Sequence, residues 1–240
     1  MKEFLLLQIN DALFPVGSYS HSYGLETYIQ KNLVYDKKTA LDYVRRYMRH
    51  NLVYGELLAV KLAWEICREC TIQHEKEKRC RQTLWELKKL DQVITASKIP
   101  LELRQASEKI ASRFLKTLIN LKIEYKFPWF EQYAQIKEKN WKKNYATAYG
   151  IFGASIALGL EESLSHFLYA QTSALITNCV KAIPLSQTVG QQILYQCIQE
   201  FDSVIVQVRS KNIDDYAISL PGADIRSMQH ENLYSRLYMS

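Results

Sequence analysis

Three groups of side chains in the sequence have the types and spacing for chemistry, and the first is a candidate metal site. Cys67, Cys70 and His74 follow the pattern Cys-x-x-Cys-x-x-x-His. On a continuous helix this pattern places two thiols and an imidazole on one face, where they could bind a soft cation. A closed zinc site needs four ligands, usually from two paired motifs, and here the second pair is missing unless Cys80 folds back. The alternative is a helix end with two half-buried thiols, so we expect no metal of the protein's own.

The second and third groups are candidate catalytic pairs. Ser20 and His21 offer a nucleophile and a base, but adjacent residues do not face each other on a helix, and no Asp is placed to orient the imidazole. His230 and Glu231 begin like the helical motif of a zinc protease, yet its second His is absent. The glycines form neither of the phosphate-binding loops typical of nucleotide enzymes. The sequence therefore predicts that this protein is not an enzyme.

One segment is suited to contact with another surface. Residues 14–26 (FPVGSYSHSYGLE) combine aromatic rings, hydroxyl groups and two glycines in a turn that leads into a helix. The alternative is a tight, well-capped helix start, with Ser18 or Ser20 as the cap and no further role.

The elements that must position these residues are helices, because the chain has few residues that make turns. Its 240 residues include 8 glycines and 5 prolines, about half the usual share of each. A β-sandwich or barrel needs a turn about every ten residues, and turns use glycine and proline. We predict an all-α fold: a single-domain helical bundle over residues 1–222, followed by a flexible C-terminal tail over 223–240 that binds a partner.

Charge and cysteine usage exclude other classes. The net charge of +6 is mild and the signs are mixed, so we expect no nucleic-acid partner. The 5 cysteines are odd in number and scattered, and the apolar start is too short for a signal peptide, which together indicate a reducing cytoplasm. The longest uncharged stretches, 145–160 and 163–180, are rich in polar residues and are expected to be buried core helices, not membrane spans.

Apolar spacing and proline positions predict where the helices lie. Asp36 is placed to cap one helix, Pro100 to begin another, and Ser186 to cap a helix over 188–208. The other helices are expected over 25–29, 41–48, 52–66, 84–94, 103–121, 144–160 and 162–182, with a break near 73–78.

A stripe of small residues marks the helix expected over 144–160. Ala146, Gly150 and Ala154 recur every four residues, which lets another helix backbone approach closely. We expect this helix and the one over 162–182 to form the centre of the bundle. Residues 223–240 are polar with isolated apolar side chains, and we expect them to stay mobile until a partner covers them.

Several segments form a set in chain order. The first is the segment 14–26, the second is 183–191 (IPLSQTVGQ), and the third is 230–240 (HENLYSRLYMS). Together with residues 100–104 (PLELR) and the helix after them, they resemble the urease accessory protein UreF family. Ser186 stands where most members have glycine, but serine keeps the helix start because it caps well.

The resemblance implies an all-α homodimer with a non-enzymatic role in urease maturation. Members of the family act in a complex with the accessory protein UreD, called UreH in some species, and with the GTPase UreG. That complex inserts nickel into apo-urease. The resemblance thus implies a scaffold that bridges UreD/UreH and UreG and modulates GTP hydrolysis, with nickel and GTP handled by the complex.

The residues that bind partners are expected within these motifs. One hypothesis places Arg236 against Tyr19, as a cation–π or hydrogen-bonded pair that positions both segments for UreD. A second assigns Lys181, Gln187 and Gln191 to the surface that meets the GTPase or the dimer mate. The other candidate contact residues are His21, Tyr23, Glu26, His230, Glu231, Tyr234 and Tyr238.

Two other classes stay open. A metal-binding carrier would use Cys67, Cys70 and His74, and tight uptake of Ni²⁺ or Zn²⁺ that is lost on Cys67→Ser/Cys70→Ser would favour it. A hydrolase would use Ser20 and His21, and would require an activity that disappears with His21→Ala.

Overall fold

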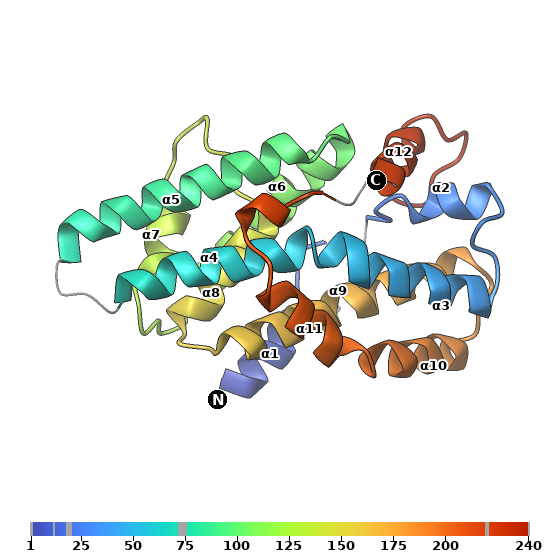
Figure 1. Cartoon of the computed structure of the whole chain (residues 1–240), viewed down its shortest axis with the longest axis horizontal. Helices are drawn as coiled ribbons and strands as arrows, with labels where there is room; N and C mark the ends of the chain where they lie inside the picture. The colour runs from blue at the N-terminus through green and yellow to red at the C-terminus, as the bar shows by residue number, and fades with distance from the viewer. Residues whose placement is uncertain (1, 12, 18–20, 72–75, 219–220, 240) are drawn as a thin grey trace.

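The computed structural model describes residues 2–11, 13–17, 21–71, 76–218 and 221–239. These parts of the chain form helices and connecting turns with no strand, so the predicted all-α fold is confirmed (Figure 1). The helices are α1 Lys2–Asn10, α2 Leu25–Gln30, α3 Lys37–Arg46, the π-helix η2 Tyr47–Leu52, α4 Glu56–Thr71, α5 Lys76–Ser97, α6 Leu101–Asn120, α7 Trp129–Gln135, α8 Tyr145–Ser155, α9 Leu160–Ala182, α10 Gln187–Ile198, α11 Phe201–Arg209, the 3-10 helix η3 Ile213–Asp215 and α12 Pro221–His230. No helix among the described residues is both long enough and apolar enough to cross a membrane.

Helix α8 is the centre of the bundle, since every one of its residues is buried. A Cβ on Gly150 would lie 2.3 Å from the carbonyl oxygen of Val60, so α8 and α4 pack backbone to backbone. The stripe of small residues therefore admits a second helix, as predicted, but that helix is α4 as well as the expected α9. Both fit because the glycines of α8 face different ways: a Cβ on Gly153 would lie 2.5 Å from the Oγ of Ser163, in α9.

Aromatic rings fill the space between α8 and its other neighbours. Phe114 of α6 is fully buried, and its ring centroid lies 5.3–6.1 Å from those of Phe130 in α7 and of three aromatic residues in α8. Edge-to-face contacts predominate in this cluster, which is the geometry that aromatic quadrupoles favour. The cluster holds α6 and α7 against the central helix.

Three helix starts follow the predicted local signals, whereas α2 begins after Gly24 and not at a cap by Ser18 or Ser20. The carboxylate of Asp36 accepts a hydrogen bond from the backbone N–H of Thr39 at 2.8 Å, and the Thr39 hydroxyl accepts one from the N–H of Asp36. The hydroxyl of Ser186 likewise accepts from the N–H of Val189 at 3.2 Å and caps α10. Pro100 is the N-cap of α6.

The single helix expected over 188–208 is wrong, because the chain turns at Gln199 and Glu200 and forms α10 and α11 separately. Glu200 explains the turn, since its carboxylate lies 2.7 Å from Arg45 Nε and 2.8 Å from an Arg49 amino group. The helical spacing of apolar residues continues across Gln199 and Glu200, so the sequence pattern does not predict that the helix ends there.

A buried aspartate ties α5 to the segment that leads into α8. Asp91 has no exposed surface and accepts hydrogen bonds from the Tyr133 hydroxyl at 2.7 Å and the Trp141 indole at 2.8 Å. The backbone N–H of Asn144 donates to the same carboxylate at 3.1 Å. Burial raises the pKa of Asp91, and these hydrogen bonds oppose the rise. The network fixes Asn144, the N-cap residue of α8.

The C-terminal segment packs against the bundle, so the expected flexible tail is not confirmed. Helix α12 lies beside α2 at one end of the molecule and also contacts α6, and the described residues after it return toward α2 (Figure 1). Sequence alone suggested mobility because the apolar side chains of this segment are isolated. What holds the segment is a set of polar contacts with residues far away in the chain.

Candidate functional site

The N-terminal motif 14–26 meets the C-terminal part of the chain where α2 and α12 pack, and a glycine makes the close approach possible. Gly24 has a φ of +83°, in the region that favours glycine. A Cβ on Gly24 would lie 2.8 Å from the Oγ of Ser227 and 3.2 Å from its backbone nitrogen. Beside it, the Thr27 hydroxyl donates to the carbonyl oxygen of Arg226 at 2.9 Å. The Gly-Leu-Glu sequence of the N-terminal motif is therefore the place where α12 packs.

Four ionisable side chains lie at this contact, and we call them the tail junction: Glu26, Glu102, His230 and Arg236. His230 is 0% exposed, with Nε2 3.0 Å from an oxygen of Glu26 and Nδ1 2.8 Å from an oxygen of Glu102. The guanidinium of Arg236 lies 2.9 Å from the other oxygen of Glu102. A neutral imidazole has one N–H, whereas an imidazolium donates from both nitrogens. Both ring nitrogens of His230 face a carboxylate oxygen, and Glu102 faces both the imidazole and the guanidinium of Arg236.

Glu26 also binds the backbone of the chain beyond α12. Its carboxylate accepts hydrogen bonds from the N–H of Leu237 at 2.7 Å and from the N–H of Tyr238 at 3.3 Å. The Gln30 side chain donates to the carbonyl oxygen of Ser235 at 2.9 Å. The Tyr238 hydroxyl donates to the carbonyl oxygen of Asn178 in α9 at 3.3 Å. The C-terminal motif is thus held by two different helices.

His21 belongs to the same assembly. The Asn178 side chain donates to the carbonyl oxygen of His21 at 2.8 Å. Burial lowers the pKa of His21 to about 4, the positive charges of Lys109 and Arg113 add to this effect, and Glu102 opposes it. The imidazole is therefore uncharged at neutral pH. Ser20 lies outside the described residues, so the Ser20–His21 pairing stays untested.

A row of aromatic rings connects the N-terminal motif and α2 to the π-helix. The centroid of Tyr47 lies 6.5 Å from that of Tyr23 and 6.2 Å from that of Tyr43. Tyr28 continues the row 5.1 Å from Tyr43, and the guanidinium of Arg226 in α12 lies 5.7 Å above the ring of Tyr28. Burial raises the pKa of Tyr43 and of Tyr47 well above the usual range, so both hydroxyls stay protonated. A π-helix inside a helical run is often found at functional sites.

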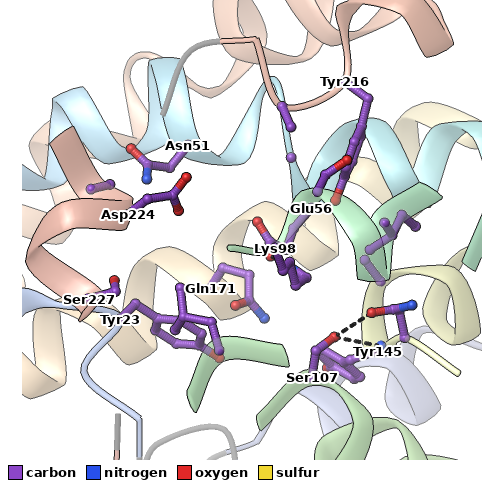
Figure 2. Close-up of a pocket in the computed structure, with 18 of the residues that line it drawn as sticks. Tyr23, Asn51, Glu56, Lys98, Ser107, Tyr145, Gln171, Tyr216, Asp224 and Ser227 are labelled. Atoms are coloured by element: carbon purple, nitrogen blue, oxygen red, sulfur yellow. Dashed lines mark hydrogen bonds and ion pairs between the residues drawn. The ribbon is translucent and has the colours of Figure 1, made fainter. Parts of the chain in front are cut away.

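A pocket of about 70 Å³ lies beside the contact between α2 and α12, lined by Tyr23 of the N-terminal motif and Ser227 of α12 among others (Figure 2). The Nζ of Lys98 lies 2.5 Å from a carboxylate oxygen of Glu56 in its wall. Burial alone would lower the pKa of Lys98, but Glu56 raises it above the usual range, so the ammonium stays protonated. Burial raises the pKa of Asp224, which faces the same space; Lys98 opposes the rise and Glu56 adds to it.

The cavity can hold water. Its volume exceeds the roughly 10–15 Å³ that one water molecule requires, and the buried hydroxyl oxygen of Ser227 has no hydrogen-bond partner among the described residues. Those residues contain no group of three or more His, Cys, Asp or Glu side chains arranged to hold a metal ion.

The second motif lies apart from the tail junction. Lys181, Gln187 and Gln191 are all exposed around the turn between α9 and α10. In Figure 1, α10 lies on the other side of α3 from α12. Gly190 is needed here, because a Cβ on it would lie 2.7 Å from a methyl group of Val180. The structure therefore separates two surfaces that the sequence presented as one set of contact residues.

Three further candidate contact residues remain, of which the structure describes Glu231 and Tyr234 but not Tyr19. Glu231 and Tyr234 are exposed, and the side chain of Tyr234 is entirely so. Tyr19 lies outside the described residues, so its contact with Arg236 stays a prediction.

The metal-carrier hypothesis is also untested. Cys67 is buried in the core. The side chain of Cys70 and the whole of His74 lie outside the described residues, so whether the three converge stays a prediction.

The sequence interpretation missed Glu102 and Asn178 as site residues. Glu102 did stand within the segment 100–104, in the first turn of a helix, where a carboxylate is favourable. A carboxylate in the first turn is explained by the helix start alone, so the sequence did not indicate that Glu102 contacts His230. No local sequence pattern marks Asn178 as a site residue, since its role depends on contacts of α9 with His21 of one terminal motif and Tyr238 of the other.

Residues 34–198 match the sequence model of the UreF family. The chain belongs to the UreF family. UreF proteins are accessory proteins of urease maturation with a role in nickel insertion. The matched range begins just before α3 and ends with α10. It therefore includes neither terminal motif, and of the tail-junction residues it includes Glu102 alone.

Proposed function

We propose that this UreF protein is a non-catalytic scaffold that bridges UreD/UreH and the GTPase UreG. In this role it acts as a homodimer, modulates GTP hydrolysis by UreG, and supports nickel insertion into apo-urease. Residues 223–240 are the segment that meets UreD/UreH. Nickel and GTP are handled by the complex, and the chain uses no cofactor of its own.

The observation that carries the proposal is the tail junction. Segments 14–26, 100–104 and 230–240 each contribute a charged side chain to it, and the pairing of those charges serves to hold the C-terminal segment in place. Held in this way, the segment presents large apolar side chains to solvent: Tyr234 is 105% exposed and Leu237 is 75% exposed. Apolar anchors on an ordered segment are typical of a protein-binding surface.

The UreD surface is tested by co-purification with UreD/UreH. We expect Arg236→Ala to reduce recovery of UreD/UreH strongly, because the guanidinium orders the segment through Glu102. Tyr19→Ala is expected to act in the same direction. Arg209→Ala is the matched control, since Arg209 is also an exposed arginine paired with a glutamate, Glu161. Recovery of UreD/UreH that is unchanged by both Arg236→Ala and Tyr19→Ala would refute the assignment.

The UreG surface is tested separately on α9 and α10. Lys181 is exposed and precedes a helix start, so a positive charge there can steer an acidic partner. We expect Lys181→Glu to weaken recruitment of UreG while recovery of UreD/UreH is kept. UreG recruitment that neither Lys181→Glu nor added salt reduces would count against this surface.

A further inference from the structure

Positive charge is concentrated in one part of the chain that the proposed function does not use. Residues 108–143 contain 9 lysines and arginines and 4 glutamates, a formal net charge of +5 compared with +6 for the whole chain. These residues cover most of α6, all of α7 and the segment that leads to α8. Eight of the nine basic side chains are exposed, the exception being Lys143.

Much of this charge is not neutralised within the protein. Glu108 pairs with Lys142 at 2.8 Å, and Glu138 pairs with Lys88 of α5. Lys116 and Lys137 have no acidic partner among the described residues. The excess positive charge acts on a neighbouring group, since Lys109 and Arg113 help to lower the pKa of the buried His21. This part of the surface therefore has a positive potential.

An apolar groove of about 420 Å³ lies within this positive surface. One wall is α6, with Leu115, Lys116 and Ile119, and the other is the segment after α7, with Ile136 and Trp141. Ile119 is 39% exposed. The groove thus combines an apolar floor with the exposed Lys116 in its wall, and the exposed Lys137 follows Ile136 directly in the chain. Glu108 also lines the groove, where it pairs with Lys142. Lys143 does not contribute its charge to a ligand, because its ammonium donates to three backbone carbonyl oxygens at the end of α7.

We propose that this groove, which we call the α6–α7 groove, is a docking site for an acidic segment of a protein partner. Carboxylates of the segment pair with Lys116 and Lys137, and one or two of its apolar side chains enter between Ile119 and Ile136. The inference goes beyond the scaffold function above, since it adds a surface apart from the tail junction and from the α9–α10 turn.

The chemistry favours an acidic protein over a nucleic acid. Binding of single strands uses exposed aromatic rings on which bases stack. Here Trp129, Phe130, Tyr133 and Trp141 are all buried. Phosphate recognition also favours arginine, and only one of the nine basic residues, Arg113, is an arginine. An apolar floor suits leucine-like side chains better than it suits a sugar–phosphate backbone.

The test measures binding of a fluorescein-labelled peptide of repeated Glu-Glu-Leu units to the full chain by fluorescence anisotropy. We expect Lys116→Glu/Lys137→Glu to weaken binding by about tenfold or more, because two favourable charges become repulsive. Lys31→Glu/Lys38→Glu is the matched control, since it makes the same change of net charge at exposed lysines elsewhere. For this control we expect a change of less than about twofold.

A second measurement tests the groove itself. We expect Ile119→Ser to weaken binding of the leucine peptide and to leave unchanged the weaker binding of a matched peptide with serine in place of leucine. Equal effects of the two charge-reversal pairs, equal affinity for the leucine and serine peptides, or no binding by the wild type would each overturn the proposal. Tighter binding of a single-stranded oligoribonucleotide than of the acidic peptide would also overturn it.

Discussion

Replacing His230 with leucine removes the side chain that joins Glu26 to Glu102. Leucine fills a similar space but has no N–H, so each carboxylate loses one charge-assisted hydrogen bond. Leaving a buried carboxylate without one of its donors costs about 3–5 kcal/mol. We expect the lower end of this range, about 3 kcal/mol, because Glu26 keeps two backbone donors and Glu102 keeps Arg236.

This loss is expected to appear first as local opening of the C-terminal segment. The N–H of Leu237 donates directly to Glu26, so its hydrogen-exchange rate reports whether the segment is in place. At 1.4 kcal/mol per tenfold change, about 3 kcal/mol corresponds to exchange roughly 100-fold faster in His230→Leu. Hydrogen exchange followed by NMR or mass spectrometry measures this rate, and urea denaturation measures the global change.

Two comparisons make the result decisive. His166→Leu is the control, because His166 is half-buried in α9 without an ion pair among the described residues, and we expect it to change stability by less than about 0.5 kcal/mol. The double-mutant cycle of Glu26→Gln and His230→Leu measures their coupling directly. Exchange of the C-terminal amides at the wild-type rate in His230→Leu, or strict additivity in the cycle, would refute the reasoning.

Three further predictions concern the buried parts of the molecule. His21 titrates at 6.5 when unfolded and at about 4 when folded, so the unfolded state binds more protons between these values. The free energy of unfolding therefore rises with pH across this window and is lost on acidification toward pH 4, by at most about 3 kcal/mol from this group. His21→Gln should flatten that slope in urea titrations at a series of pH values, and curves parallel to the wild type would contradict it. Gly150→Ala should lower stability by about 1–3 kcal/mol because its Cβ meets a backbone carbonyl of α4. Gly222→Ala, inside α12 with nothing within 4 Å of its Cβ, should be neutral or slightly stabilising. Equal melting temperatures for these two variants would rule out the close α4–α8 packing. Asp91→Asn should destabilise the fold by about 1–3 kcal/mol, because an amide replaces one acceptor oxygen with a donor that faces the donors Tyr133 and Trp141. Asp202→Asn, at an exposed position, is the control in thermal melts. An equal drop in melting temperature for both variants would contradict the role of the Asp91 network.

Local signals in the sequence predicted much of the helical framework. Capping by Asp36 and by Ser186 acts within three residues, so the sequence contains the whole interaction. The scarcity of glycine and proline similarly limits the number of turns. The break at Gln199–Glu200 could not be found in this way, because it depends on Arg45 and Arg49 of other elements.

The sequence by itself determined the fold class, the positions of most helices and the segments that make contacts. The tertiary structure alone decided that Glu26, Glu102 and His230 form one site, since the chain separates Glu102 from His230 by 128 residues and Glu26 from His230 by 204. It also decided that the C-terminal segment is held in place. The physical reason is that helix formation depends on neighbours in sequence, whereas the pairing of buried charges depends on which helices pack together.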